Sequence, residues 1–193
     1  MLYARVHPSV NVLLFLAYAC ACAGEDGEKQ QQPPETTPTT TRNASVLRNL
    51  DTAFWTTGLT AKPGAAMSTV TEVRTWPHDE FERIVFTFEP DVSGYHVEYV
   101  DRPVRQCGSG EVVELPGDGW LSIKLEPAQA HTEEGRPTIE ERTRDLNYGN
   151  IKRIKLICDF EGQVEWIVAV TSPTRYRTLE LRDPARLVVD LKK

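Results

Sequence analysis

The residue types that support catalysis are present in this sequence, but not at the spacing that catalysis requires. Histidine, the commonest metal ligand, occurs at His78, His96 and His131, and Glu134 supplies a carboxylate close to the last of these. None of them forms an HExxH motif or lies beside a CxxC pair, the arrangements that bring zinc ligands together. The pattern therefore gives no support for a metal site.

Other catalytic motifs are missing as well. The sequence has no Gly-x-Ser-x-Gly elbow, no phosphate-binding loop and no dinucleotide fingerprint. Gly108-Ser109-Gly110 is typical of a flexible loop. Carboxylates are plentiful, yet no pair stands in apolar surroundings of the kind that glycosidases use to shift a pKa. We therefore expect no enzymatic activity and no cofactor.

Aromatic and arginine side chains offer binding chemistry instead. Tyr95 and Tyr99 lie on one expected strand, and an aromatic ring can stack on a sugar ring. Arg83 and Arg186 can donate hydrogen bonds to hydroxyl or carboxylate groups through the planar guanidinium. All four side chains have an ordinary alternative role in packing. Further stacking candidates are Trp76, Trp120 and Tyr148.

The first residues indicate export. Arg5 and the amino terminus supply positive charge, residues 12–19 form an apolar run, and small residues follow up to Ala23. Such a run is a signal sequence rather than a membrane-spanning helix. Two kinds of processing remain open: ordinary cleavage of residues 1–23, or lipidation of Cys22 or Cys20 as in a bacterial lipoprotein. Both place the folded part outside the cytoplasm, either secreted or anchored by lipid at the outer face of the membrane.

The next segment, residues 24–66, is rich in Gln, Pro and Thr and too poor in apolar residues to offset its chain entropy. We expect a disordered linker there, followed by one folded domain at 67–193. The segment also holds a few apolar residues, which form a short helical turn, fold back onto the domain or make an adhesive spot in the linker: Val46, Leu47, Leu50, Phe54 and Trp55. The formal net charge of -6 argues against nucleic acid as a partner, because nucleic acids favour basic surfaces.

Only two cysteines fall in the expected domain, Cys107 and Cys158. Export permits a disulfide between them, provided that their Cα atoms lie about 4.4 to 6.8 Å apart. The alternative is that Cys158 is a small buried apolar side chain at the end of a strand.

From residue 68 onward the sequence alternates between apolar and polar residues, which is the period of β-strands. The clearest example is 176–191, where Leu187 and Val189 share one face and Val188 and Asp190 the other; we expect a hairpin there with a type I turn at 182–185. About nine short strands, with no convincing helix, predict an all-β fold, an antiparallel β-sandwich or a barrel-like variant. Residues 112–115 are counted among these strands, whereas 126–150 show no clear period and are expected to be a solvated loop.

Two expected strands share one sequence motif, an arginine followed by apolar residues. It occurs at Arg83-Ile84-Val85-Phe86 and at Arg186-Leu187-Val188-Val189-Asp190. With Val70-Thr71-Glu72-Val73-Arg74 and Asp183-Pro184-Ala185-Arg186, this resembles the AMIN domain of bacterial cell-wall amidases. The similarity is greater to the AMIN-like domains of actinobacterial secreted proteins and lipoproteins, and it covers residues 68–193.

The resemblance implies a β-sandwich that binds or localises to peptidoglycan without catalysing a reaction. Arg83, Arg186 and Asp190 fall on the signature strands, either as ligand contacts or, for Asp190, as part of a structural ion pair. The leading hypothesis is a lipid-anchored envelope module that binds peptidoglycan. The alternatives are a protein–protein interaction subunit of an envelope assembly, and an enzyme with an unrecognised site.

Overall fold

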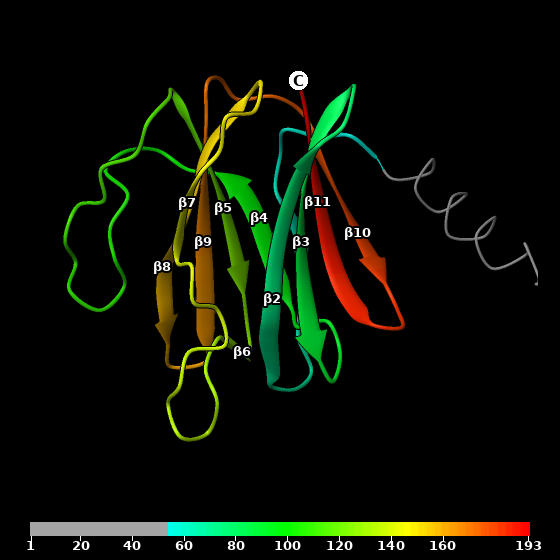
Figure 1. Cartoon of the computed structure of the whole chain (residues 1–193), viewed down its shortest axis with the longest axis vertical. Coiled ribbons are helices and arrows are strands. Elements are labelled where there is room, and N and C mark those ends of the chain that lie inside the picture. Colours follow the sequence, from blue (N-terminus) through cyan, green and yellow to red (C-terminus); the bar gives the residue numbers. More distant parts are fainter. Residues whose placement is uncertain (1–53) are drawn as a thin grey trace, which may run out of the picture. The chain divides into compact units, whose positions relative to one another are not determined.

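The computed structural model describes residues 54–193, and these residues form two β-sheets (Figure 1). The predictions for the signal sequence, for lipidation of Cys22 or Cys20 and for most of the linker lie outside the described residues. Within 54–193 the regular elements are all strands, and no helix there is long and apolar enough to cross a membrane. The predicted all-β fold is confirmed.

The two sheets have the following strands. The six-stranded sheet has the order β1 (Thr60–Lys62), β4 (Tyr95–Tyr99), β5 (Gly119–Leu125), β9 (Gln163–Val170), β8 (Ile151–Phe160) and β7 (Thr143–Asp145). The five-stranded sheet has the order β10 (Tyr176–Leu181), β11 (Ala185–Lys192), β3 (Phe81–Glu89), β2 (Ser68–Pro77) and β6 (Ala128–Gln129). Neighbouring strands are antiparallel except β2 and β6, which pair in parallel over two residues.

The main core lies between the sheets, because each strand turns alternate apolar residues toward the other sheet. The ring of Phe86 on β3 lies 6.2 Å from that of Trp166 on β9, a contact that joins the two sheets. Full burial of each such side chain stabilises the fold by roughly 1.5–3 kcal/mol. The predicted alternation is confirmed for the terminal hairpin, where Leu187 and Val189 are buried in this core and Val188 faces away from it.

Residues 54–66, which we call the strap, contact strands of both sheets. Thr56 exchanges two backbone hydrogen bonds of 2.8 Å with Tyr176 of β10, and β1 pairs with β4. The Tyr176 hydroxyl lies 2.6 Å from the Gly58 carbonyl oxygen, to which it can donate. The strap therefore attaches to both sheets along one edge.

The described residues form eleven strands, two more than the nine predicted. β1, β6 and β7 were missed because they have only two or three residues each. The strand expected at 112–115 does not form; that segment makes a single bridge, Arg105 to Val112, and belongs to a loop. The turn at 182–185 connects a hairpin as expected but is not type I, because Asp183 has φ +58° and a type I turn needs a negative φ there.

The loop at 101–115 covers the outer face of the six-stranded sheet. Val104, Val113 and Leu115 pack there on Ile167 and Ala169, forming a second small core. A disulfide between Cys107 and Cys158 joins this loop to β8, with the Cα atoms 5.2 Å apart.

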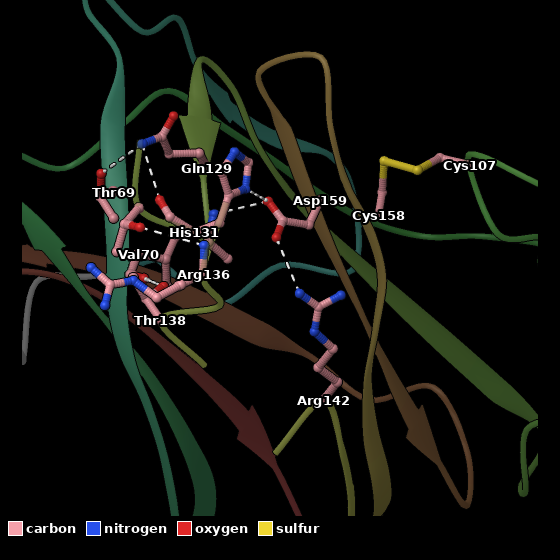
Figure 2. A network of polar contacts seen from close by, with 12 residues as sticks. Thr69, Val70, Cys107, Gln129, His131, Arg136, Thr138, Arg142, Cys158 and Asp159 are labelled. Atoms are coloured by element: carbon pink, nitrogen blue, oxygen red, sulfur yellow. Dashed lines mark hydrogen bonds and ion pairs between the residues drawn. A yellow bond between two sulfur atoms is a disulfide. The ribbon is translucent and has the colours of Figure 1, made fainter. Parts of the chain in front are cut away.

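One carboxylate makes several of the contacts that hold the segment 126–150 in place. Asp159, on β8, accepts hydrogen bonds of 2.9 Å from the Ala130 amide and from Nδ1 of His131. Arg142 lies 3.5 Å from its second oxygen, and Figure 2 shows the carboxylate between these groups, one residue beyond the disulfide on β8. The Thr138 hydroxyl donates to the Val70 carbonyl oxygen at 2.6 Å, which ties the segment to β2 as well.

Candidate binding site

Asp190 lies on the outer side of the five-stranded sheet, opposite Arg83 of β3 and Arg177 of β10 in the strand register. Directly opposite residues project from the same face, so the register itself brings the three side chains together. Arg83 donates to both carboxylate oxygens, at 2.6 and 2.8 Å, and Arg177 donates at 2.9 Å. The carboxylate is fully buried, while the side chains of Arg83 and Arg177 are 13% and 11% exposed.

Aromatic rings are interleaved with these cations. The Phe81 ring lies 5.0 Å from the Arg83 guanidinium and 5.3 Å from that of Arg177. Trp55, from the strap, lies 4.6 Å from the Arg177 guanidinium and 4.9 Å from the Lys192 ammonium. Such cation–π contacts contribute about 0.5–2 kcal/mol each and hold both partners in place.

His78 adds a further aromatic ring next to Phe81. Its imidazole stacks on Phe81 with the ring centres 4.3 Å apart, and its Nε2 accepts a hydrogen bond from the Trp76 indole. Burial, and then the positive charge of Arg83, lower the pKa of His78. The imidazole is therefore neutral at neutral pH, as its acceptor role toward Trp76 requires.

An apolar patch continues the same face toward the terminal turn. Val85, Leu179 and Val188 are buried side by side, with Trp76 and Leu181 packed at their margin. We call the outer side of β2, β3, β11 and β10, together with Trp55, the cation–aromatic face. The charged strand residues that the register places on it are five cations, Arg74, Arg83, Arg177, Arg186 and Lys192, against three anions, Glu72, Glu89 and Asp190.

Arg186 is the most available of the arginines that the sequence singled out. It is partly exposed, and its Nε donates to the Pro184 carbonyl oxygen at 3.2 Å within the turn. In the described part of the chain its remaining guanidinium donors have no partner, whereas Arg83 uses two donors on Asp190. Arg186 therefore has guanidinium donors available for a ligand. The Arg83 guanidinium is bonded to Asp190 and so links β3 to β11.

The two candidate tyrosines are not on this face. Tyr99 packs edge-on against Tyr176 at 6.1 Å, donates to the Thr174 carbonyl oxygen and accepts from the Thr174 amide. Burial raises the pKa of Tyr99, so its hydroxyl stays protonated in this structural role. Tyr95 lies at the other end of β4, next to the strap.

The remaining candidates take separate positions. Trp120 lies beneath the Arg102 guanidinium at 4.0 Å, and Tyr148 shares a 3.3 Å hydrogen bond with Thr75. His96 pairs with Glu98 and His131 with Asp159. Across residues 54–193 no group of three or more His, Cys, Asp or Glu side chains converges as a metal site would require.

Arg177 was missed by the sequence analysis. It could have been found from the hairpin register, since a hairpin that turns at 182–185 places residue 177 opposite Asp190. For Trp55 the sequence offered folding back onto the domain as one alternative, but a segment without strand periodicity could not indicate which residues it would contact.

Comparison with known families gives one match. The model of the AMIN-like domain matches residues 68–193, which include all of the cation–aromatic face except Trp55. No curated protein and no solved structure gave a match.

Proposed function

Because the chain belongs to the AMIN-like domain family, whose members are extracytoplasmic, peptidoglycan-related and non-catalytic modules, we propose that it binds peptidoglycan through the cation–aromatic face. The observation that carries the proposal is the combination of aromatic rings and excess positive charge on one sheet face of a protein whose net charge is -6.

The chemistry of the face suits this ligand. Peptidoglycan presents sugar rings together with carboxylates on its stem peptides. Sugar rings pack on aromatic rings such as Trp55 and Trp76, and carboxylates accept charge-assisted hydrogen bonds from Arg186 and Lys192. In this proposal Asp190 and Arg83 hold the face in shape and do not touch the ligand.

Sedimentation with purified sacculi tests the proposal. We expect the protein to pellet with sacculi, and Arg186→Ala to reduce the pelleted fraction several-fold. Arg136→Ala is the matched control, because the Arg136 side chain is 77% exposed and lies in the 126–150 segment, away from the face. Pelleting no greater than that of an unrelated exported protein would rule out peptidoglycan as the ligand and favour a protein partner.

We also propose a lipid anchor at Cys22 or Cys20, which rests on the sequence pattern alone. Metabolic labelling with a fatty-acid probe should label the wild type and fail to label the variant that lacks the acceptor, Cys22→Ala or Cys20→Ala. Absence of label in the wild type would indicate ordinary signal cleavage and secretion.

A further inference from the structure

The disulfide between Cys107 and Cys158 lines a cleft that has no residue in common with the cation–aromatic face. The cleft has a volume of ≈ 370 Å³, which is at the small end of the roughly 300–1,000 Å³ of ligand pockets. It is bounded by the tip of the loop at 101–115 and by residues 155–160 of β8. Another molecule can therefore reach the disulfide from solvent.

The two sulfur atoms differ in access. Cys107 lies at the exposed tip of the loop, whereas Cys158 is on β8 and is only 4% exposed. Figure 2 shows the bridge leading from Cys158 toward the loop and away from the Asp159 carboxylate. Because access helps to decide which sulfur of a disulfide a thiolate attacks, an incoming thiolate meets Cys107 first.

The loop keeps its shape through contacts of its own. It doubles back as a small hairpin, in which the Val113 amide donates to the Val104 carbonyl oxygen at 2.9 Å. Closer to the tip, the Gln106 amide donates to the Glu111 carbonyl oxygen, also at 2.9 Å. Val104 and Val113 pack on the outer side of the six-stranded sheet. The cross-link at the tip can therefore open locally while both sheets stay folded.

Lys155 places a positive charge at the cleft. It lies opposite Ile167 in the register, and the Ile167 side chain packs beneath the loop on the outer side of the sheet. Within residues 54–193 the Lys155 ammonium has no ion-pair partner. Asp159 is the only carboxylate among the described residues that line the cleft, and its oxygens already bond to the 126–150 segment. Because a neighbouring cation stabilises a thiolate, Lys155 favours both the approach of an attacking thiolate and the release of the Cys158 thiolate.

Phe160 offers an apolar contact next to the disulfide. Its side chain lines the same cleft, and the residue is 58% exposed, although it directly follows the buried part of β8. Aromatic side chains are enriched in the surfaces that protein partners cover. The cleft is therefore better suited to a dithiol carried by a protein than to a small thiol alone.

We propose that the Cys107–Cys158 disulfide is a thiol–disulfide exchange site for a protein dithiol outside the cytoplasm. A thiolate of the partner attacks the Cys107 sulfur, the Cys107–Cys158 bond breaks, and its electron pair leaves on Cys158, which takes up a proton. The second thiolate of the partner then attacks the partner's sulfur in the mixed disulfide and releases Cys107 as a thiolate, which is protonated in turn. The partner is oxidised to a disulfide, and this protein gains two electrons and two protons. The site does not depend on peptidoglycan binding at the other sheet.

Reaction with reduced glutathione tests which sulfur is attacked. The folded full-length protein is mixed with glutathione and quenched with acid, and the mixed disulfide is located by mass spectrometry. We expect glutathione on Cys107, and mixed disulfide chiefly on Cys158 would overturn the proposal. The reduction rate should also stay constant in urea concentrations below the unfolding transition. A rate that rises in proportion to the unfolded fraction would show that the bridge opens only in the unfolded chain, which contradicts the proposal.

Variants test the cleft with two reductants, dithiothreitol and purified thioredoxin, whose dithiol is protein-borne. Lys155→Gln should slow reduction by both several-fold, whereas Lys124→Gln, on β5 and outside the cleft, should not. Phe160→Ser should slow reduction by thioredoxin and leave reduction by dithiothreitol unchanged. A wild-type rate in Lys155→Gln, or a Phe160→Ser variant that reacts with thioredoxin like the wild type, would overturn the proposal. All three variants should pellet with sacculi like the wild type.

Discussion

Asp190 is the residue on which the outer face of the five-stranded sheet depends. A fully buried carboxylate is stable only when its charge and its lone pairs are matched, and Arg83 and Arg177 supply both. Arg83 therefore contributes directly to the fold.

Substitution at this ion pair gives the first prediction. Arg83→Ala leaves half of the Asp190 carboxylate unpaired in a buried position, so the free energy of unfolding should fall by about 3 kcal/mol. Urea denaturation followed by tryptophan fluorescence measures the change. Arg186→Ala is the comparison and should change stability by no more than about 0.5 kcal/mol, because only its Nε is engaged, within its own turn. Equal stability of the two variants would show that the Asp190 pairing is dispensable.

At the residue scale, alternation assigns Arg83 and Asp190 each to a face of its own strand. It does not indicate that the two strands are neighbours in one sheet, which the structure shows. The separate location of Tyr95 and Tyr99 could not be predicted, since alternation assigns a side chain to a face of its own sheet but gives no information about the position of the other sheet. Cys107 and Cys158 share this limit, because their separation depends on how the loop at 101–115 folds over β8.

At the scale of elements, the strap connects the two sheets. It supplies β1 to one sheet and the Thr56 bridge to the other, and it brings Trp55 against Arg177. The family match begins at residue 68, after the strap ends.

The strap should therefore be needed for stability. A chain that starts at residue 67 loses the two bonds to Tyr176 and the pairing with β4, each backbone hydrogen bond contributing about 1 kcal/mol net. We expect it to unfold at a urea concentration well below that of a chain starting at residue 54, with a loss of about 3 kcal/mol or more. Identical midpoints for the two chains would contradict this role for the strap.

The disulfide at Cys107 and Cys158 is the second connection at this scale. It spans 51 residues, and loop-closure entropy predicts about 4 kcal/mol of stabilisation for a cross-link of that length. The double variant Cys107→Ser/Cys158→Ser should lose stability of this order. A matched measurement is the wild type with and without reductant, where the loss should agree with the double variant; insensitivity to both would mean that the loop at 101–115 is held by its apolar contacts alone.

Elements were predictable from sequence according to their length. Strands of five or more residues alternate long enough to be recognised, whereas β1, β6 and β7 gain their hydrogen bonds from neighbours and carry little pattern of their own. Residues 112–115 do show the pattern but pack Val113 and Leu115 on the outer face of the sheet instead of extending its edge.

At the scale of the whole molecule, three tyrosines near one edge of the sandwich predict its response to alkaline pH. Burial raises the pKa of Tyr99 and of Tyr176 above 10.0, and burial followed by the charge of Glu180 raises that of Tyr95. A raised folded-state pKa means that the folded protein keeps protons that the unfolded chain releases. The resulting stability is complete below about pH 10 and is lost as the pH rises through the folded-state pKa values.

We therefore expect these tyrosines to leave the urea midpoint of unfolding nearly unchanged from pH 8 to 9.5. Above pH 10 the midpoint should fall steeply. Tyrosinate absorbance should rise together with unfolding rather than before it. Tyr99→Phe removes one of the three groups and should make the fall shallower. Ionisation of all tyrosines at pH 10 in a protein that remains folded would contradict the prediction.

The two layers of the sandwich also determine what stays accessible after binding. The outer sides of the five-stranded and six-stranded sheets point in opposite directions, because the core lies between them. A wall polymer seated against Arg186 and Trp76 would leave the opposite side of the molecule, with the disulfide-linked loop at 101–115, facing solvent. One side of the protein would then contact the wall, and the other side would remain accessible to a second molecule.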